Sequence, residues 1–499
     1  MHEMTMKQRV IHWICHNFSF FIFGVLCIVW FLFRTGTKPS RITYPCQQAS
    51  LAGAHLWSAV YLLPLVSMVR SKGNGGGQAA RLLGAAIIMG VIIICALYFF
   101  GVLNPNHFPE ELSPSNGTSD IFVVNGTTGN DGGVNQLLKL MEREGTPFYA
   151  TGNGTSNAGI IAKDDVVIIK VNAQWDERGG TNTDLVKSLI QAIVDHPEGF
   201  TGEIIVADNG QMQYGATGTG GNLNYTKNNA EDRSQSMTRV AGSFAGTYRV
   251  STYLWDTITT KRVHEYAEGD MDDGYIVNET RNPRTGILVS YPKFRTRYGT
   301  YVSFKKGIWN TETGAYEEDR LKIINVPVLK SHGTYGVTGA VKNYMGVPSD
   351  KLTAEMGSRT HSTVDEGGMG SEMAETRFPA ITVLDAIWIN AKPGDGPETP
   401  YDSATRTTII AAGTDPIALD FWAAQHILMP TAKSLGYSDL SSMDPENTSR
   451  GKFGCWLRLS MMELQQAGYP VTIDKNAMHV YFVENTVPGG ILTNETRSR

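Results

Sequence analysis

One stretch, Leu321–Gly346, constrains the fold of this chain more than any other. It begins with an apolar run of strand length that is rich in β-branched residues. Lys330 and His332 follow at the predicted end of this strand, and a loop punctuated by glycines leads on to Lys342 and Asn343. In an open α/β sheet, ligands bind beyond the carboxyl ends of the strands. The stretch therefore predicts a buried strand that ends at a positively charged site for an anion or cofactor.

Strand-like and helix-like segments alternate along the chain on both sides of this stretch. The predicted strands are residues 121–124, 165–172, 203–208, 380–385 and 407–412, and the predicted helices are 133–144, 183–195 and 415–428. Such alternation favours an α/β fold, with a parallel or mixed sheet and flanking helices. The polar segment 210–313 has few clear periods, and we interpret it as an insertion that ends with a short strand at 286–291.

Long apolar runs without charge precede this domain. Residues 11–33 and 82–103 are each long enough to cross a bilayer as a helix, and 49–69 is a third candidate that contains a proline. We expect an N-terminal membrane region, residues 1–104, with two or three transmembrane helices. The lipid bilayer is then a partner, and residues 105–499 form a single α/β domain.

The charges around these runs bear on orientation. The chain turns acidic directly after residue 103, which places the following domain outside the cytoplasm under the positive-inside rule. The basic loop at 34–41 conflicts with a three-span arrangement. Seven Asn-x-Ser/Thr patterns, such as the one at Asn224, lie beyond the last apolar run. We therefore expect a cell-membrane protein with a large extracytoplasmic domain that is a candidate for glycosylation.

Composition excludes several classes of function. The net charge of -5 and the pI near 6.1 do not favour a nucleic-acid binder. The chain has 5 cysteines and no C-x-x-C pattern, so zinc-ribbon, iron–sulfur and thioredoxin sites lack their ligands, and no metal site is predicted. A disulfide between Cys46 and Cys455 stays open, since sequence alone does not place their Cα atoms.

Further candidate binding residues follow two other predicted strands. Residues 165–172 end with Lys170 and Asn172, and a loop with an Arg and two glycines then leads into a helix. Backbone N–H groups at such a place can hold an anion. The alternative is a tight turn in which Thr183 caps the helix. Asp208 ends the next strand and is either a ligand-orienting carboxylate or a turn residue. The candidates for cofactor binding are Lys170, Asn172, Arg178, Gly179, Gly180, Thr181, Asp208 and Asn343.

The candidates for catalysis are basic. His332 can transfer protons near neutral pH, and a lysine held near other cations loses pKa and can act as a base or nucleophile. Lys330 and Lys342 are the lysines in question, and His361 is a second candidate for proton transfer. The glycine-proline loop 392–397 could close over a ligand.

Several of these segments together resemble the domain-of-unknown-function 362 family. The similar segments are residues 166–172, 325–332, 337–346, 394–397 and 415–420, and Tyr44–Cys46 resembles the membrane-anchored branch of that family. The resemblance covers about residues 120–430 and implies an α/β domain without a generally assigned activity. Many members carry a fused ferredoxin module, whose cysteines this chain lacks. The family fold is thought to be similar to the N-terminal part of nickel-dependent lactate racemase, which uses histidines and a lysine around its cofactor.

The sequence thus predicts a membrane-anchored protein whose α/β domain binds a small anionic molecule or cofactor at the strand ends. This site could be an enzyme site with lysine and histidine acid–base chemistry. The alternative is a non-catalytic cell-surface or envelope assembly protein in which the motifs maintain the fold. The identity of any cofactor and of protein partners stays unknown from sequence.

Overall fold

The computed structural model describes residues 117–152, 159–211 and 221–485. All of them belong to one unit of the chain, Ser113–Arg499. The three apolar runs predicted to span a membrane lie outside the described residues, as does Cys46. Cys455 is buried and forms no disulfide with another described residue. Within the described ranges, no helix combines the length and apolar character needed to cross a bilayer.

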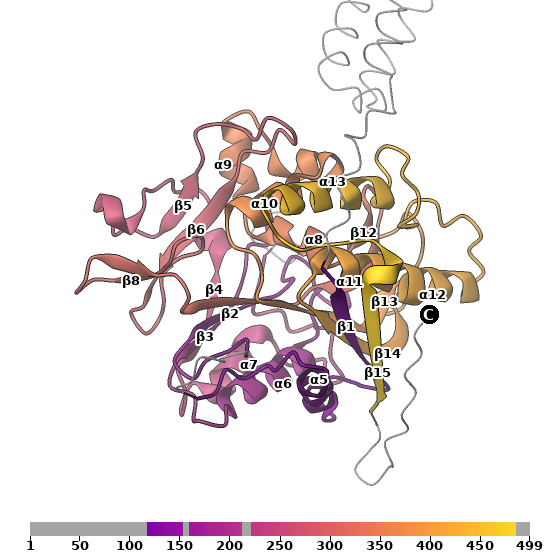
Figure 1. Cartoon of the computed structure of the whole chain (residues 1–499), viewed down its shortest axis with the longest axis horizontal. Helices are drawn as coiled ribbons and strands as arrows, with labels where there is room; N and C mark the ends of the chain where they lie inside the picture. The colour runs from indigo at the N-terminus through magenta and orange to yellow at the C-terminus, as the bar shows by residue number, and fades with distance from the viewer. Residues whose placement is uncertain (1–116, 153–158, 212–220, 486–499) are drawn as a thin grey trace, which may run out of the picture. The chain divides into compact units, whose positions relative to one another are not determined.

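A ten-stranded mixed sheet forms the centre of this unit (Figure 1). The strand order is β15-β1-β14-β13-β10-β2-β3-β4, and β11 joins through β13 and carries β12. Only β14 and β12 run antiparallel to their neighbours. The strands are β1 Ser119–Asn125, β2 Val166–Lys170, β3 Glu203–Asp208, β4 Val250–Leu254, β10 Leu321–Asn325, β11 Val328–His332, β12 Gly336–Thr338, β13 Ile381–Asn390, β14 Thr405–Gly413 and β15 Met478–Glu484. The predicted α/β fold with flanking helices is confirmed, in the form of a mixed sheet.

Helices cover both faces of the main sheet (Figure 1). In β2, Val167 and Ile169 pack in one hydrophobic cluster, and Val166 and Ile168 pack in another. This alternation follows from the two-residue period of a strand, and it explains why a strand buried on both faces is a continuous apolar run. The helices on the first face are α5 Gly133–Arg143, α6 Thr183–Val194 and α7 Met237–Phe244, and those near the second are α8 Ala340–Asn343, α9 Asp350–Glu355, α10 Gly368–Glu375, α11 Pro416–Ala423, α12 Met429–Ser434 and α13 Phe453–Gln466.

Short helical turns complete the unit. The 3₁₀ turns are η2 Trp255–Thr257, η3 Tyr266–Glu268, η4 Tyr344–Gly346, η5 Thr360–Glu366 and η7 Lys475–Ala477, and η6 Ala424–Leu428 is a π-helical turn. The predicted helix at 415–428 is therefore an α-helix only as far as Ala423. Its predicted cap is confirmed, since Asp415 Oδ1 accepts hydrogen bonds from the N–H groups of Ile417 and Ala418.

The strand predicted within Leu321–Gly346 is interrupted. The apolar run divides into β10 and β11 at Val326 and Pro327. Proline has no N–H to donate and fixes φ, so the hydrogen-bond ladder cannot continue through it. The glycine-rich loop also differs from the prediction, because Gly336–Thr338 forms β12 and pairs with β11 as a hairpin. This arrangement brings Lys330 and α8 to the same edge of the sheet.

The polar middle segment contains more regular structure than its sequence indicates. It contains α7, which covers the main sheet, and β4, which belongs to that sheet. A second, antiparallel sheet follows, with the strand order β5-β6-β7-β8-β9 (Figure 1). The strands are β5 Gly274–Val277, β6 Ser290–Arg295, β7 Tyr301–Ser303, β8 Gly307–Asn310 and β9 Ala315–Glu317. The strand predicted at 286–291 is displaced, since Ile287–Val289 precede β6 as buried irregular chain.

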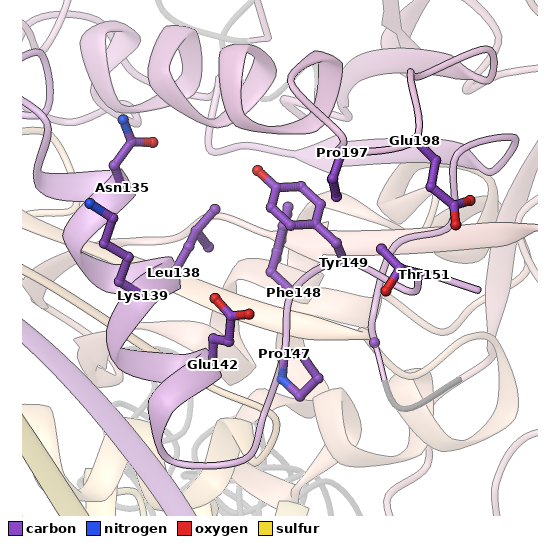
Figure 2. Close-up of a pocket in the computed structure, with 11 residues that line it drawn as sticks. Asn135, Leu138, Lys139, Glu142, Pro147, Phe148, Tyr149, Thr151, Pro197 and Glu198 are labelled. Carbon is purple, nitrogen blue, oxygen red and sulfur yellow. The ribbon is translucent and has the colours of Figure 1, made fainter. Parts of the chain in front are cut away.

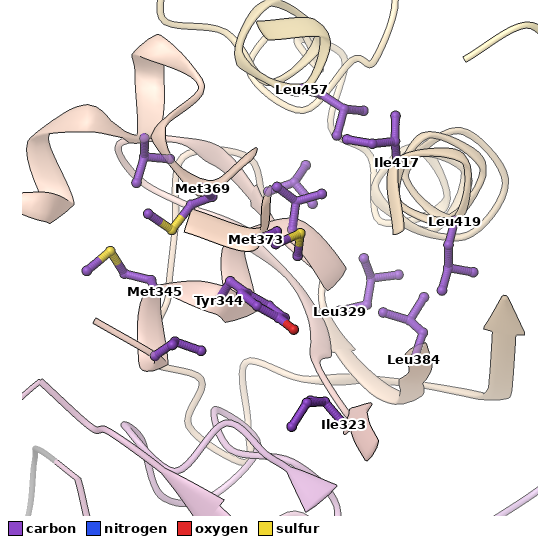
Figure 3. Packing of buried hydrophobic residues seen from close by; sticks show 14 of the residues in the cluster. Ile323, Leu329, Tyr344, Met345, Met369, Met373, Leu384, Ile417, Leu419 and Leu457 are labelled. Atoms are coloured by element: carbon purple, nitrogen blue, oxygen red, sulfur yellow. The ribbon is translucent and has the colours of Figure 1, made fainter. Parts of the chain in front are cut away.

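A hydrophobic cluster lies directly behind the predicted site. Tyr344 and Met345 of η4 lie among Met369, Met373 and Leu329 in Figure 3. Tyr344 is fully buried, and its hydroxyl donates to the carbonyl oxygen of Arg377. The turn that follows α8 is therefore fixed by core packing.

Candidate functional site

Four parallel strands end at one edge of the main sheet. These are β2, β3, β10 and β11, and their last residues are Lys170, Asp208, Asn325 and His332. A small cavity of about 10 Å³ lies at this edge, close to the smallest volume that holds a water molecule. Its lining includes Lys170, Asn172, Gln174, Asp208, Asn209, Gln211, Lys330, Thr338, Lys342, Asn343, Met345, Gly346 and Pro397. Six of the twelve site residues predicted from sequence are therefore brought together here.

Lys170 and Asp208 form a buried ion pair with 2.7 Å between Nζ and Oδ1. Lys170 Nζ also donates to the carbonyl oxygens of Val171 and Asn343, at 2.9 and 2.6 Å. Asp208 Oδ2 accepts from the N–H of Ala173 at 2.7 Å. Burial lowers the pKa of Lys170 and raises that of Asp208, while the attraction between the two charges opposes both shifts. Lys170 uses its donors within the protein and acts as a structural cation.

Lys330 and Lys342 differ from Lys170, because no carboxylate of the described residues forms an ion pair with either of them. Lys330 Nζ donates to the carbonyl oxygen of Gly179 and is almost completely buried. Burial first, and then the charge of Lys342, hold the pKa of Lys330 well below its usual range, although Asp208 and Asp385 oppose this. Burial and the charge of Lys170 lower the pKa of Lys342 to about 7. An anion in the cavity would offset both positive charges.

Asp420 positions the helix that carries Lys342. Its carboxylate accepts hydrogen bonds from the N–H groups of Ala340 and Val341, the first residues of α8. Gly339 is required at the preceding position, because a Cβ there would overlap Asp420 Oδ1. The pKa of Asp420 is raised to about 7 by burial, which these hydrogen bonds only partly offset. A side chain from α11 thus caps α8 and fixes the base of the lysine.

The two predicted catalytic histidines lie next to the cavity but not in its lining. The ring centroids of His332 and His361 are 6.5 Å apart, and each packs against Tyr335. His332 Nδ1 accepts hydrogen bonds from the N–H groups of Thr334 and Tyr335, at 3.1 and 3.2 Å. Burial, followed by the charges of Lys342, His361 and Lys330, lowers the pKa of His332 far below neutral. His332 is therefore a neutral imidazole that carries its proton on Nε2.

His361 is held neutral in a similar way. Burial lowers its pKa to about 3, with further contributions from Lys342 and Arg359. Its backbone carbonyl oxygen accepts a hydrogen bond from the Tyr335 hydroxyl at 2.6 Å. Of the groups predicted to be catalytic, Lys342 is the one whose pKa of about 7 suits proton transfer near neutral pH.

Buried polar atoms around the cavity lack partners. Asn172 Oδ1, Gln211 Oε1, Thr338 Oγ1 and Asn343 Oδ1 have no hydrogen-bond partner among the described residues. All four side chains line the cavity, and each is more than nine-tenths buried. Leaving such groups unpaired costs about 1–3 kcal/mol each, so the arrangement favours a bound water or polar ligand.

The Arg178–Thr181 loop has a different role from the predicted anion cradle. Thr181 Oγ1 accepts from the N–H of Asn172 and donates to the carbonyl oxygen of Val326, both at 2.7 Å. The N–H groups of Arg178, Gly179 and Thr181 donate to carbonyl oxygens within the protein. Gly180 has no room for a side chain, because an added Cβ atom would overlap the carbonyl oxygen of Trp175. The helix cap is the Asn182 side chain, and Thr183 is the first residue of α6. The loop supports the cavity, because its Gly179 carbonyl oxygen accepts the hydrogen bond from Lys330 Nζ.

Arg178 points away from the cavity lining. Its guanidinium lies over the ring of Trp388 at 4.1 Å and near the ring of Tyr401 at 5.2 Å. It donates to Asn229 Oδ1 at 3.1 Å. Asp385 also accepts a hydrogen bond from Asn229, at 3.2 Å, and one from the N–H of Asn182 at 2.9 Å. This cluster joins the loop to β13.

Some lining residues were not predicted. Asn209 and Gln211 follow β3, and Thr338 ends β12. The signal for Asn209 and Gln211 was their place directly after a strand whose carboxylate was already a candidate. Thr338 could not be found from periodicity, because its strand is short and was interpreted as a loop. Pro397 belongs to the loop predicted to close over a ligand, and it lines the cavity.

A larger pocket of about 700 Å³ lies between α5 and the segment Pro147–Thr151 (Figure 2). Lys139, Glu142 and Glu198 line it, so its charges have mixed sign. The Tyr149 hydroxyl donates to the carbonyl oxygen of Ala192. This pocket offers no convergent set of buried groups. Within the described part of the chain, no group of three or more His, Cys, Asp or Glu side chains is placed to hold a metal ion.

Fold and site define a mixed α/β domain with a buried cationic cavity at the carboxyl edge of its sheet. Residues 295–425 match the model of the family described as Domain of unknown function (DUF362). The predicted resemblance to this family is confirmed over that segment, which is shorter than the predicted range of about 120–430 and does not show a membrane-anchored branch. The segment carries Lys330 and Lys342, whereas Lys170 and Asp208 lie before it.

A curated relative shows a similar partial match. The chain is 30% identical over 129 residues to the Thylakoid-associated protein sll1697 of Synechocystis sp.. The aligned part covers 24% of this chain and 39% of the relative, so the chain matches well under half of that protein. No solved structure matches the chain.

Proposed function

We propose that this domain binds a small anionic molecule or cofactor at the carboxyl edge of the main sheet, with Lys330 and Lys342 as its charge partners. The observation that carries the proposal is that both ammonium groups line one buried cavity without an ion-pair partner among the described residues. Buried charges are normally paired, so an anion supplies what the protein does not.

The unpartnered amide and hydroxyl groups support the same proposal. The amide oxygens of Asn172, Gln211 and Asn343 could accept from a ligand that also carries hydrogen-bond donors. The Thr338 hydroxyl could donate to the same ligand. The cavity of about 10 Å³ holds at most a water molecule in this form. A larger anion requires the lining to open, and Pro397 and its loop are the segment predicted to move.

An enzymatic role would rest on Lys342. Its pKa of about 7 allows it to take up and release a proton at neutral pH, and His332 would act as a neutral hydrogen-bond donor through Nε2. In the alternative function, the domain is a non-catalytic surface or envelope assembly protein. The internal hydrogen bonds of the Arg178–Thr181 loop favour that reading for this part of the motif.

Calorimetric titration of the full chain with oxalate, pyruvate and inorganic phosphate separates these functions. Binding of any of the three that is reduced at least tenfold in Lys330→Met and in Lys342→Met supports the proposal. Lys433→Met is the matched control, since Lys433 is exposed on α12. Unchanged binding in both cavity variants would contradict the proposal. Heat-labile variants with no binding of any anion to the native chain would favour the assembly role.

We further propose that the N-terminal region anchors the chain in the cell membrane, with the large domain outside the cytoplasm. The charge-free runs at 11–33 and 82–103 support this placement, and the curated relative is named as thylakoid-associated. When membranes are washed with alkaline carbonate, the chain should stay in the membrane pellet. Protease added to intact cells should cleave the large domain. Glycosidase sensitivity would test the Asn-x-Ser/Thr sites. Release by carbonate would contradict the anchoring.

A further inference from the structure

The geometry points to a covalent role for Lys342: we propose that its amine forms an imine with the carbonyl group of a small carboxylate, a 2-oxo acid, whose carboxylate is held by Lys330. This inference rests on the proposed anion site and specifies the chemical class of its ligand. It gives the two lysines different roles, since Lys342 reacts with the carbonyl group and Lys330 holds the carboxylate.

Placement of Lys342 is the first step. α8 is capped by the Asp420 carboxylate and is followed by the buried turn η4, so the backbone on both sides of the lysine is fixed. Its Nζ lies 5.2 Å from the centroid of the Tyr335 ring. Unlike Lys170 and Lys330, it makes no hydrogen bond to a carbonyl oxygen of the described residues. Its nitrogen is therefore available to a ligand.

The surroundings of the nitrogen are the second step. An amine reacts with a carbonyl only when it is unprotonated, and desolvation beside other cations produces this state. Lys342 is buried, and its charge acts on Lys330, His332 and His361. Burial and Lys170 lower its pKa to about 7, so close to half of the amine is neutral at that pH. Burial and the charge of Lys342 hold the pKa of Lys330 well below its usual range, and Asp208 and Asp385 oppose this shift. A carboxylate that enters the cavity would stabilise the charged form of Lys330 further, and Lys330 already donates to the Gly179 carbonyl oxygen.

The polar atoms of the cavity complete the site. The hydroxyl of Thr338 and the amide of Asn343 line it without partners for Oγ1 and Oδ1 among the described residues. The Thr338 hydroxyl can donate to the carbonyl oxygen of the ligand, and Asn343 Oδ1 can accept from the hydroxyl of the intermediate that forms from it. These groups are uncharged, so they do not compete with Lys330 for the carboxylate.

The reaction balances without a further reactant. The lone pair of Lys342 Nζ adds to the carbonyl carbon and forms a C–N bond, and the carbonyl oxygen takes up a proton from the nitrogen. The resulting carbinolamine then expels this oxygen as water with the second amine hydrogen, and a C=N bond forms. One water leaves for each imine formed, and nothing is oxidised or reduced.

Reductive trapping tests the inference. The full chain is incubated at pH 7 with pyruvate and sodium cyanoborohydride, which reduces an imine to a stable secondary amine, and peptide mass mapping locates the adduct. We expect labelling of Lys342 to exceed that of exposed Lys433 by roughly 100-fold, because an ordinary lysine with a pKa near 10.4 is almost entirely protonated at pH 7. Oxalate, which has no ketone, should compete, and Lys330→Met should slow the labelling.

The outcomes separate this inference from the proposed function. Pyruvate that binds in calorimetry but leaves Lys342 unlabelled overturns the imine and leaves the anion site intact. Labelling spread evenly over surface lysines, or labelling of Lys342 that oxalate does not reduce, also overturns it. If pyruvate neither binds nor labels Lys342, and no other anion binds, both the imine and the proposed anion site are wrong. Lys342→Arg provides the second check, since it keeps a cation for anion binding but removes the reactive amine.

Discussion

Gly346 lies so close to Asp208 that a Cβ atom on this glycine would overlap the carboxylate oxygen Oδ1. The same Cβ would meet Lys170 Nζ, so the backbone of η4 packs directly on the buried ion pair. A hydrogen bond from the N–H of Asn209 to the carbonyl oxygen of Gly346, at 3.0 Å, holds the two segments together. The segment that matches DUF362 is thus joined to strands that precede it in the chain.

We expect Gly346→Ala to destabilise the domain by roughly 2–4 kcal/mol, because the methyl group must separate Asp208 from Lys170 or displace η4. Urea unfolding of the full chain measures the change. Gly242→Ala is the control, since Gly242 is an exposed residue of α7 with open space around it, and alanine there should be neutral or slightly stabilising. Equal effects of the two substitutions would contradict the close packing.

Removing the charge of Asp208 should destabilise the domain at least as much as Gly346→Ala. Asp208→Asn leaves the ammonium of Lys170 buried without a counter-charge, and we expect a loss of about 3–5 kcal/mol. The matched control is Asp272→Asn, which breaks an exposed ion pair with Lys261 and should cost less than about 1 kcal/mol. Thermal unfolding of both variants gives the comparison. A loss at Asp208 no larger than at Asp272 would show that the buried pair is not ionic.

Lys342→Met should stabilise the ligand-free domain by about 1–2 kcal/mol at pH 7, because it removes the cost of burying an amine. Burial lowers the folded-state pKa to about 7, below the unfolded value near 10.4, so the unfolded state binds more protons between these pH values. Stability of the native chain therefore rises with pH across this window, and the full cost applies below it.

The advantage of the Lys342→Met variant should thus be greatest at pH 7 and shrink towards pH 10. Urea unfolding at both ends of the window measures it, with Lys433→Met as the exposed control. An advantage that grows with pH would have the wrong sign for a lowered lysine pKa and would refute this account.

Asp420 should affect the site at a distance through α8. Asp420→Ala leaves the N–H groups of Ala340 and Val341 without their acceptor, and we expect a loss of about 1–3 kcal/mol together with weaker anion binding. Asp415→Ala provides the comparison, because Asp415 caps α11 and does not contact α8. If both variants lose stability but only Asp420→Ala loses oxalate or pyruvate binding, Asp420 is a positioning residue. Equal binding losses would argue against that role.

The strands were predictable where burial on both faces makes them continuous apolar runs. β3 has the predicted bounds, and β2 lies within the predicted run, because β-branched residues dominate both. The division of the next run at Pro327 was missed, although the missing N–H of proline is visible in the sequence. The second sheet was missed because its strands are short, and their polar and aromatic residues do not alternate clearly.

Half of the predicted site residues meet in the cavity because parallel strands end at a common edge. Lys170 and Asp208 illustrate this rule, since they end β2 and β3, and Lys330 lies within the last three residues of β11. The role of Arg178 could not be foreseen, because its partners Trp388 and Tyr401 lie more than two hundred residues away in the chain. The same holds for Asp420, whose effect on α8 depends on tertiary packing.

The pairing of β1 with β15 has a consequence for synthesis of the chain. The two strands lie side by side in parallel register, and Asn125 and Glu484 are 359 positions apart. Closing so long a loop costs entropy that no local contact repays, so this pairing should form late. On the ribosome, one edge of β1 must wait until the chain has emerged as far as β15, and an exposed strand edge invites aggregation. A nascent chain of this protein should therefore depend on chaperones until β15 is released.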